Sequence, residues 1–286
     1  MISGQTLVAG VVGRPVRHSM SPLIHNHWLQ ASAIDGVYVA FSPPKDGFVT
    51  LANGMRGGAI SGLNVTLPFK EQALALAGRA DDQVSDLARL SGAANLLLFD
   101  ANGTVRVDNT DGEGLLYAFA HQAPSLNLKA APVVILGAGG AARGAAAALT
   151  LAGVPRVHIV NRTLEKAQSI ASALGPKVQA FDSASAEAAF DGVGAVINAT
   201  SLGLGGGDGP KVPWKSVSKD AVFMDMVYKP LETVFLAEAK ARGHQTVDGL
   251  DMLIGQARPS FEAFYGAPPP SSVDVRGLAL AQLTAA

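Results

Sequence analysis

The segment VVILGAGGAARG, residues 133–144, decides the fold class of this 286-residue chain. Four apolar residues lead at once into a glycine-rich turn and an alanine-rich helical run. This order matches G-x-G-x-x-G/A in the strand–turn–helix setting in which that pattern binds a dinucleotide. Gly137 permits the tight turn, Gly139 lets the backbone approach a pyrophosphate, and Ala142 lets the helix pack closely on the strand. Dinucleotide binding is therefore expected, with an ordinary glycine-rich βαβ turn as the alternative.

The residues after this segment repeat its pattern of short apolar strands and helices. The expected strands are VHIV (157–160), AVINA (195–199) and VFMDM (222–226), and the expected helices are 141–152, 164–174 and 232–242. Short, fully apolar strands that alternate with helices predict a parallel sheet covered on both faces. We therefore expect an α/β chain with a doubly wound, Rossmann-type domain at residues 112–248.

The residues before this domain predict a smaller α/β domain at 1–111. Its expected strands are 7–13, 37–41 and 59–66, its expected helices are 22–33 and 46–53, and a hairpin is expected from 95–100 and 104–109. Ser21 followed by Pro22 is typical of an N-cap and a first helical residue, and Asn102-Gly103 is typical of a hairpin turn. The segment 249–286 is expected to be helical and to return to this first domain, although Pro259 should break or kink it.

Composition narrows the class of protein. Charged residues make up 16% of the chain, hydrophobic residues 48%, and the net charge is −1, which excludes intrinsic disorder. The absence of a Lys/Arg run argues against a nucleic-acid partner. The chain has no cysteine, and its first residues do not form a basic leader segment. The longest charge-free stretch, 18–34, contains three histidines, an asparagine and a glutamine, so it is not a membrane span. We expect a cytoplasmic enzyme that binds neither membrane nor nucleic acid.

The end of the second strand of the Rossmann-type domain predicts which dinucleotide binds. An NAD site usually has a carboxylate there for the ribose 2′-hydroxyl. This chain instead has Asn161-Arg162-Thr163, whose cation and neutral polar side chains suit a 2′-phosphate. The alternative is that Asn161 and Thr163 only cap the next helix, but a cation at a helix N-terminus is unfavourable and leaves Arg162 unexplained.

Three polar clusters in the first half are candidates for a substrate site. Ser19 and Ser21 could direct two hydroxyls at a small polar molecule, or could serve only in a turn and an N-cap. Lys70 follows Pro68, so it is expected in a first helical turn, where the helix dipole suits an acid–base lysine; a solvated lysine is the alternative. Asp111 could orient Lys70 or simply cap a helix.

The histidines do not suggest a metal site. His25 and His27 would point to different faces of a helix, and no acidic ligand lies near them or His18. We expect no metal.

Taken together, nine motifs in order resemble the shikimate dehydrogenase family over nearly the whole chain. They are GRPVRHSMSPLIHN (13–26), GLNVTLPFK (62–70), GAAN (92–95), DNTDGEG (108–114), GAGGAARG (137–144), NRT (161–163), NATSLG (198–203), DMVYKPLET (225–233) and DGLDMLIGQA (248–257). The resemblance implies NADPH-dependent reduction of 3-dehydroshikimate to shikimate in chorismate and aromatic amino-acid biosynthesis.

The resemblance also assigns site residues. Lys70 and Asp111 would be the catalytic pair. The substrate contacts would be Ser19, Ser21, Asn64, Thr66, Asn95, Asp111, Tyr228 and Gln256. The NADP(H) contacts would be Gly137, Ala138, Gly139, Gly140, Ala141, Asn161, Arg162, Thr163, Thr200 and Gly249. The protein would act as a monomer or a homodimer.

The chain departs from the family pattern at three positions, and two alternative functions are considered. Leu96 replaces a usual threonine, Leu204 replaces a common methionine, and Pro259 lies in the terminal helix. One alternative is a quinate/shikimate dehydrogenase that uses NAD, whose members tend to have threonine at the position of Ser21 and an acidic residue near Arg162. The other is a catalytically silent NADP-binding regulator, which would not need both members of the catalytic pair.

Overall fold

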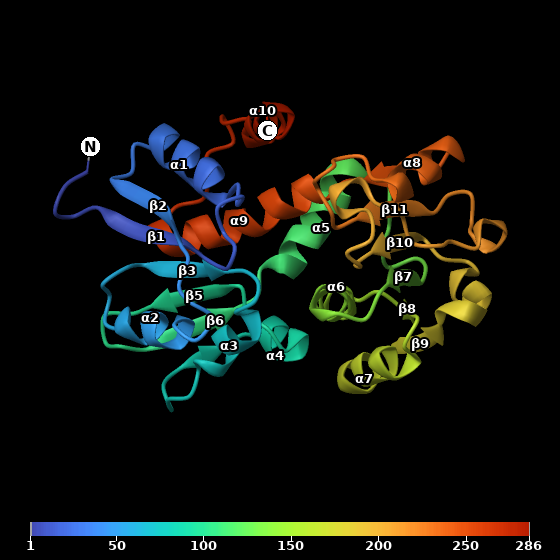
Figure 1. Ribbon diagram of the computed structural model, residues 1–286, viewed down its shortest axis with the longest axis horizontal. Coiled ribbons are helices and arrows are strands. Elements are labelled where there is room, and N and C mark those ends of the chain that lie inside the picture. The colour runs from blue at the N-terminus through green and yellow to red at the C-terminus, as the bar shows by residue number, and fades with distance from the viewer. Residues whose placement is uncertain (1, 286) are drawn as a thin grey trace. The chain divides into compact units, whose positions relative to one another are not determined.

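A computed structural model describes residues 2–285, and the chain divides into two units. The first unit comprises Met1–Thr110 and Gln256–Ala286, and the second comprises Asp111–Gly255. Each unit contains a six-stranded sheet (Figure 1). The second boundary falls inside helix α9 (Gly249–Tyr265), so the first half of this helix belongs to the second unit.

The second unit is a doubly wound α/β domain. Its strands are β7 (Val133–Leu136), β8 (Val157–Asn161), β9 (Val178–Asp182), β10 (Ala195–Asn198), β11 (Val222–Asp225) and β12 (Thr246–Val247). All are parallel, in the order β12-β11-β10-β7-β8-β9. The chain runs outward from β7 in one direction and then from β10 in the other, so the strand order reverses between these two strands. Ligands of such sheets bind at that point, beyond the carboxyl ends of the strands.

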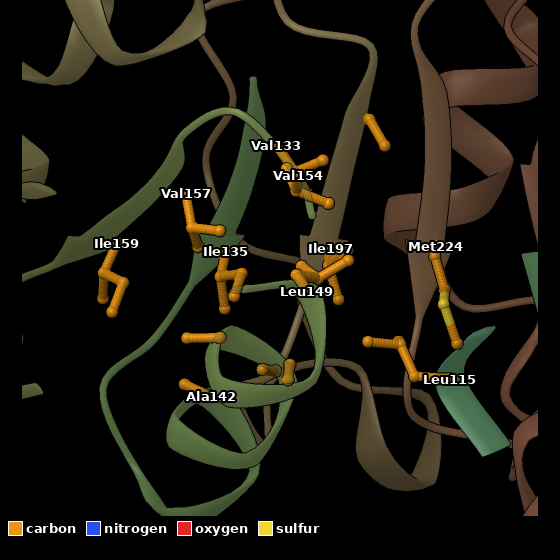
Figure 2. Close-up of a cluster of buried hydrophobic side chains, with 14 of the residues drawn as sticks. Leu115, Val133, Ile135, Ala142, Leu149, Val154, Val157, Ile159, Ile197 and Met224 are labelled. Atoms are coloured by element: carbon orange, nitrogen blue, oxygen red, sulfur yellow. The ribbon is translucent and has the colours of Figure 1, made fainter. Parts of the chain in front are cut away.

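Helices cover both faces of this sheet. They are α5 (Asp111–Gln122), α6 (Gly140–Leu151), α7 (Leu164–Leu174), α8 (Val234–Ala241) and the 3₁₀ helix η1 (Ser183–Phe190). Successive residues of β7 face opposite sides: Val133 and Ile135 pack with residues of α5, α6 and α7, as Figure 2 shows in part, whereas Val134 and Leu136 pack with residues of η1 and α8. The two apolar faces explain why these strands lack polar alternation, and the predicted doubly wound sheet is confirmed.

The first unit has a mixed sheet. Its strands are β1 (Leu7–Val12), β2 (Gly36–Phe41), β3 (Gly62–Val65), β4 (Gln83–Val84), β5 (Leu96–Phe99) and β6 (Val105–Asp108), in the order β2-β1-β3-β5-β6-β4. Strand β1 is parallel to β2 and β3, while β5 is antiparallel to β3 and β6. The predicted hairpin is therefore confirmed, and Gly103 supplies the positive φ (+86°) that its turn requires.

Six helices contribute to the first unit. They are α1 (Ser21–Ala31), α2 (Phe48–Gly54), α3 (Lys70–Ala75), α4 (Asp86–Ser91), the second half of α9, and α10 (Val275–Ala285). Helices α2 and α3 bring Phe48 and Phe69 into a ring stack with centroids 4.9 Å apart. Trp28 of α1 meets Phe261 of α9 edge-on at 5.5 Å. The carboxyl-terminal segment thus packs within the first unit.

Two local expectations are wrong. Ser21 is the first residue of α1 rather than its N-cap, and Met20, which occupies the cap position, makes no side-chain cap bond. Helix α9 continues through Pro259, so the helix is not broken there. Proline removes one helical hydrogen bond at a cost of about 3 kcal/mol, but burial of Phe261 and Phe264 on the same helix offsets a loss of that size. No helix within residues 2–285 has the length and apolar character to cross a bilayer.

Candidate active site

The glycine-rich turn after β7 is open on the side where a phosphate would approach. Gly137 has φ +105°, and a Cβ placed there would lie 2.9 Å from Thr200 Cγ2, so a side chain does not fit. Gly139 occupies the cap position of α6 with no side-chain cap bond. A Cβ at Gly139 or Gly140 would meet nothing within 4 Å. The start of this twelve-residue helix therefore has open space beside its backbone, and a helix N-terminus with such space suits an anion.

A cavity of about 670 Å³ adjoins this turn, within the size range of small-molecule sites. It lies at the carboxyl ends of β7, β8 and β10. Four of the predicted cofactor residues line it: Gly137, Asn161, Arg162 and Thr200. The sequence did not single out its other polar lining side chains, which are Ser183, Glu187 and Lys211. The remaining predicted cofactor residues, Ala138, Gly139, Gly140, Ala141, Thr163 and Gly249, do not line this cavity.

The turn after β8 presents a cation to the cavity. Asn161 Nδ2 donates to the Thr163 carbonyl at 2.8 Å, which stabilises the turn. Thr163 occupies the cap position of α7, but neither its hydroxyl nor the Asn161 side chain caps the helix. Arg162 is exposed, and no carboxylate of the described chain forms an ion pair with it. Capping therefore does not account for these three residues.

Thr200 and Gly249 each have a structural role within the second unit. The Thr200 hydroxyl donates to Asn198 Oδ1 at 2.7 Å and accepts from the Leu202 N–H at 3.1 Å, so its methyl group is the part that faces Gly137. Gly249 is buried, and a Cβ there would lie 2.5 Å from the Met226 carbonyl oxygen. Close backbone packing explains why this first residue of α9 is glycine.

Two buried asparagines lie at the centre of the polar cluster of the first unit. Asn64 Nδ2 donates to Ser260 Oγ at 2.8 Å and to the Asn95 carbonyl at 3.2 Å, while its Oδ1 accepts from the Tyr38 hydroxyl at 2.8 Å. Asn95 Oδ1 accepts from the Thr110 N–H at 2.7 Å. Both amides are thereby held in one orientation.

Helix α9 and helix α1 add to the same cluster. Asn95 Nδ2 donates to Gln256 Oε1 at 3.3 Å, so the first unit brings together three predicted substrate residues, namely Asn64, Asn95 and Gln256. Burial raises the pKa of the Tyr38 hydroxyl well above its usual value, and a hydrogen bond with buried Ser21 opposes this shift only in part. Tyr38, Thr110 and Ser260 were not predicted, because a tyrosine in an apolar strand and a serine in a terminal helix carry no local signal of function.

The remaining predicted substrate residues of the first unit lie at element ends. Ser19 Oγ accepts from the Ser21 N–H at 3.3 Å. Thr66 follows β3 and is half-buried. Lys70 is the first residue of α3, as predicted, and is half-buried; its carbonyl accepts from the Ala94 N–H at 2.9 Å, next to Asn95.

Asp111 and Tyr228 belong to the second unit. Asp111 is the first residue of α5 and follows Thr110 directly in the chain. Tyr228 lies three residues beyond β11, and burial raises the pKa of its phenol. Within residues 2–285, no group of three or more His, Asp or Glu side chains is arranged to hold a metal.

The departures from the family pattern have simple structural settings. Leu96 is buried in β5 between Asn64 on β3 and Asp108 on β6, so it fills the sheet core beside the asparagine cluster. Leu204 is exposed at the start of η2 (Leu204–Gly206), a short 3₁₀ helix that follows β10.

Comparison with known proteins gives consistent matches. The family model described as "Shikimate dehydrogenase substrate binding domain" matches residues 11–97, and the model "Shikimate / quinate 5-dehydrogenase" matches residues 118–203. A solved shikimate dehydrogenase from Thermus thermophilus, in complex with NADP(H) and shikimate, has a TM-score of 0.81 and 35% identity, covering 93% of this chain and 95% of its own. A quinate dehydrogenase from Corynebacterium glutamicum in complex with NAD has a TM-score of 0.86 and 29% identity, covering 96% and 99%.

Likeness at the level of sequence extends over both units. "Shikimate dehydrogenase (NADP(+))" of Caulobacter vibrioides is 57% identical over 279 residues, which are 98% of this chain and 96% of that protein. A likeness of this degree, over a chain with the same motifs in order, shows common descent rather than a shared fold alone. The chain belongs to the shikimate dehydrogenase family.

Proposed function

We propose that this protein catalyses the reversible NADPH-dependent reduction of 3-dehydroshikimate to shikimate, in chorismate and aromatic amino-acid biosynthesis. The observation that carries the cofactor part of the proposal is Arg162. This cation lies on the cavity wall where an NAD site would have a carboxylate, and no carboxylate within residues 2–285 forms an ion pair with it. The substrate part is supported by the full-length likeness to proteins named as NADP-dependent shikimate dehydrogenases.

Several features of the second unit support NADP(H) binding there. The open space at Gly139 and Gly140 and the positive end of α6 suit the pyrophosphate, which Gly137, Ala138 and Ala141 would also contact. Asn161, Arg162 and Thr163 would hold the 2′-phosphate, and Thr200 and Gly249 would border the nicotinamide half. The bound cofactor supplies the hydride, and the protein supplies orientation and one proton.

The first unit would hold the substrate and supply that proton. Ser19, Ser21, Asn64, Thr66, Asn95 and Gln256, with Tyr228, would bind the carboxylate and hydroxyl groups of the ring. Lys70, as an ammonium at the start of α3, would donate a proton to the C3 oxygen while the carbonyl gains a hydride, and it would take that proton back in the reverse direction. Asp111 would be the second member of the catalytic pair and would bind the neighbouring hydroxyl.

Cofactor choice gives the sharpest test. A charge-assisted hydrogen bond contributes about 1.5–3 kcal/mol, a factor of about 10 to 150 in affinity, so NADP should be preferred over NAD by at least that order. Arg162→Ala should remove most of the preference, mainly through a higher KM for NADP, with little change for NAD. The measurement is kcat/KM for both cofactors, followed by absorbance at 340 nm with shikimate.

Arg156→Ala is the matched control, because Arg156 is also exposed but lies just before the opposite end of β8. This variant should keep the wild-type ratio. If Arg162→Ala leaves the NADP/NAD ratio unaltered, the phosphate-binding role of Arg162 is wrong.

Substrate choice is tested in the same assay with quinate. Quinate has a tetrahedral C1 and an extra hydroxyl, and the two serines, Ser19 and Ser21, should favour the flat ring of shikimate. We expect a much higher kcat/KM for shikimate; equal values would assign the protein to the quinate/shikimate class. We further propose that the protein acts in the cytoplasm as a monomer or a homodimer, which cell fractionation and light scattering after size-exclusion chromatography would test.

A further inference from the structure

A carboxylate and an amide face each other at the carboxyl ends of two central strands of the second unit. Asp225 ends β11 and Asn198 ends β10, and the two are register partners on these adjacent parallel strands. Neither residue has any exposed surface. Asn198 Nδ2 lies 3.1 Å from each carboxylate oxygen of Asp225 and donates to them.

Asp225 is bound by neutral donors alone. The Thr233 hydroxyl donates to Oδ2 at 2.6 Å, and the Val227 N–H donates to Oδ1 at 2.9 Å. Within residues 2–285, no Lys, Arg or His forms an ion pair with this carboxylate. Burial raises the pKa of Asp225, and the hydrogen bonds from Thr233, Val227 and Asn198 oppose that shift. A buried carboxylate without a cation is costly, so a role in arranging its neighbours is a reasonable explanation for it.

The same arrangement orients the wall of the cofactor cavity. Because the amide nitrogen of Asn198 points at Asp225, its Oδ1 points at Thr200 and accepts from the N–H at 3.0 Å and from the hydroxyl at 2.7 Å. Asn198 Nδ2 also donates to the Leu202 carbonyl at 3.1 Å. Thr200 and Leu202 both line the cavity, and the Thr200 methyl group faces Gly137.

The Asp225 carboxylate adds acceptors on the β11 side that favour this orientation, alongside the Leu202 carbonyl and the Thr200 N–H. A reversed Asn198 amide would set its two N–H groups against the Thr200 N–H and its oxygen against the Asp225 carboxylate. Each mismatch would leave a polar group of the sheet interior without a partner, which disfavours the reversed amide. Asp225 therefore strengthens the preference for one amide orientation, in which Asn198 holds the backbone of the turn after β10.

We propose that Asp225 is a positioning residue for the cofactor site: through the Asn198 amide it holds Thr200 against the glycine-rich turn and Leu202 on the cavity wall, without touching the cofactor itself. The inference rests on the proposed NADP(H) site. Asp225 would affect cofactor affinity from inside the sheet, because it acts through the side chain of Asn198.

Exchange of the two side chains tests the proposal. Asp225→Asn removes the charge and replaces one of the two acceptor oxygens that face Asn198 with an NH₂ donor. We expect NADP⁺ to bind about tenfold more weakly, in keeping with the loss of one charge-assisted hydrogen bond. Asn198→Asp sets two carboxylates side by side, so that one of them retains a proton near neutral pH. In this variant, but not in the wild type, the affinity for NADP⁺ should fall further as the pH is raised from about 6 to about 9.

The double exchange, Asn198→Asp with Asp225→Asn, again places one carboxylate and one amide at the two strand ends. The new carboxylate can accept from Thr200, so we expect NADP⁺ affinity to return to within about threefold of the wild type. Titration calorimetry with NADP⁺ and the melting temperature without ligand are measured for every variant. Asp220→Asn is the control, because this exposed carboxylate precedes the opposite end of β11 and should change neither quantity.

The outcomes separate the possibilities. If Asp225→Asn lowers only the melting temperature and NADP⁺ affinity is unchanged, Asp225 is purely structural and the proposal is overturned. If Asp225→Asn does not fold, Thr200→Val decides: it keeps the methyl group and removes the hydroxyl bond to Asn198, and wild-type affinity in that variant overturns the proposal. A wild-type protein that does not bind NADP⁺ at all would instead overturn the proposed function.

Discussion

The imidazole of His25 should make the stability of the first unit depend on pH in a way that one substitution removes. His25 is fully buried in α1, and its ring stacks on Tyr38 with centroids 4.0 Å apart and planes 9° apart. Neither ring nitrogen has a hydrogen-bond partner in the described structure. Burial lowers the pKa of His25 from 6.5 to about 3, because the charged imidazolium would lose its hydration without gaining a partner.

The sign and size of the effect follow from this shift. Below pH 6.5 the unfolded chain binds a proton at His25, whereas the folded chain does not until the pH approaches 3. The effect of His25 on the free energy of unfolding is therefore absent above pH 6.5. Below that pH, His25 lowers the free energy of unfolding by about 1.4 kcal/mol per pH unit. The loss reaches about 5 kcal/mol across the whole interval and about 3 kcal/mol at pH 4.5.

His25→Phe keeps a ring against Tyr38 and removes the titrating group. We expect the variant to gain stability relative to the wild type as the pH falls below 6.5, by about 1.4 kcal/mol per unit. Urea denaturation between about pH 7.5 and about pH 4.5 measures the difference. In a Trp214→Phe background, Trp28 is the one remaining tryptophan, so its fluorescence reports on the first unit.

His18→Gln serves as the control, because His18 is exposed. Its stability curve should run parallel to that of the wild type. If the curves for His25→Phe and the wild type also stay parallel, a protonated His25 is tolerated in the folded state and the reasoning is refuted.

Three further predictions concern single side chains. Lys70→Ala should lower kcat by about 10² to 10⁴ with a much smaller change in the KM for shikimate, and a near wild-type kcat would remove Lys70 from the catalytic pair. Gly137→Ala should raise the KM for NADP⁺, because the new methyl group meets Thr200 and the backbone is strained by about 1–3 kcal/mol; an unchanged KM would contradict this. Arg56→Met should destabilise the first unit by about 3–5 kcal/mol in urea denaturation, since it leaves the carboxylate of Asp82 buried and unpaired, whereas a change below about 1 kcal/mol would show that water replaces the guanidinium.

The loss of stability in Arg56→Met should depend on pH, because its cause is the charge of Asp82. Hydrogen bonds from Arg56 are the main cause that holds the pKa of this carboxyl well below its usual value. A lowered pKa contributes stability above the unfolded pKa, and this contribution is lost as the pH falls. The stability difference between the wild type and Arg56→Met should therefore shrink below about pH 4.

The sequence by itself determined the architecture of the second unit. Four-residue apolar strands and the turn at Gly137 are local patterns, because strand burial and turn geometry depend on a few consecutive residues. The position of Lys70 at the start of a helix was predictable for the same reason. The edge strands β9 and β12 were not predicted, because β9 is largely half-buried with a mixed sequence and β12 has only two residues, so neither has an apolar run to reveal it.

Only the tertiary structure decided which side chains meet. Asn64 and Ser260 are 196 residues apart and Asn198 and Asp225 are 27 apart, yet each pair is joined by a hydrogen bond. The partner of a buried polar group depends on strand register and on which helix returns to a sheet, and neither is written in the spacing of nearby residues. The sequence showed His25 as one of three histidines around a helix, but its desolvation results from aromatic rings that α1, β2 and α9 bring together.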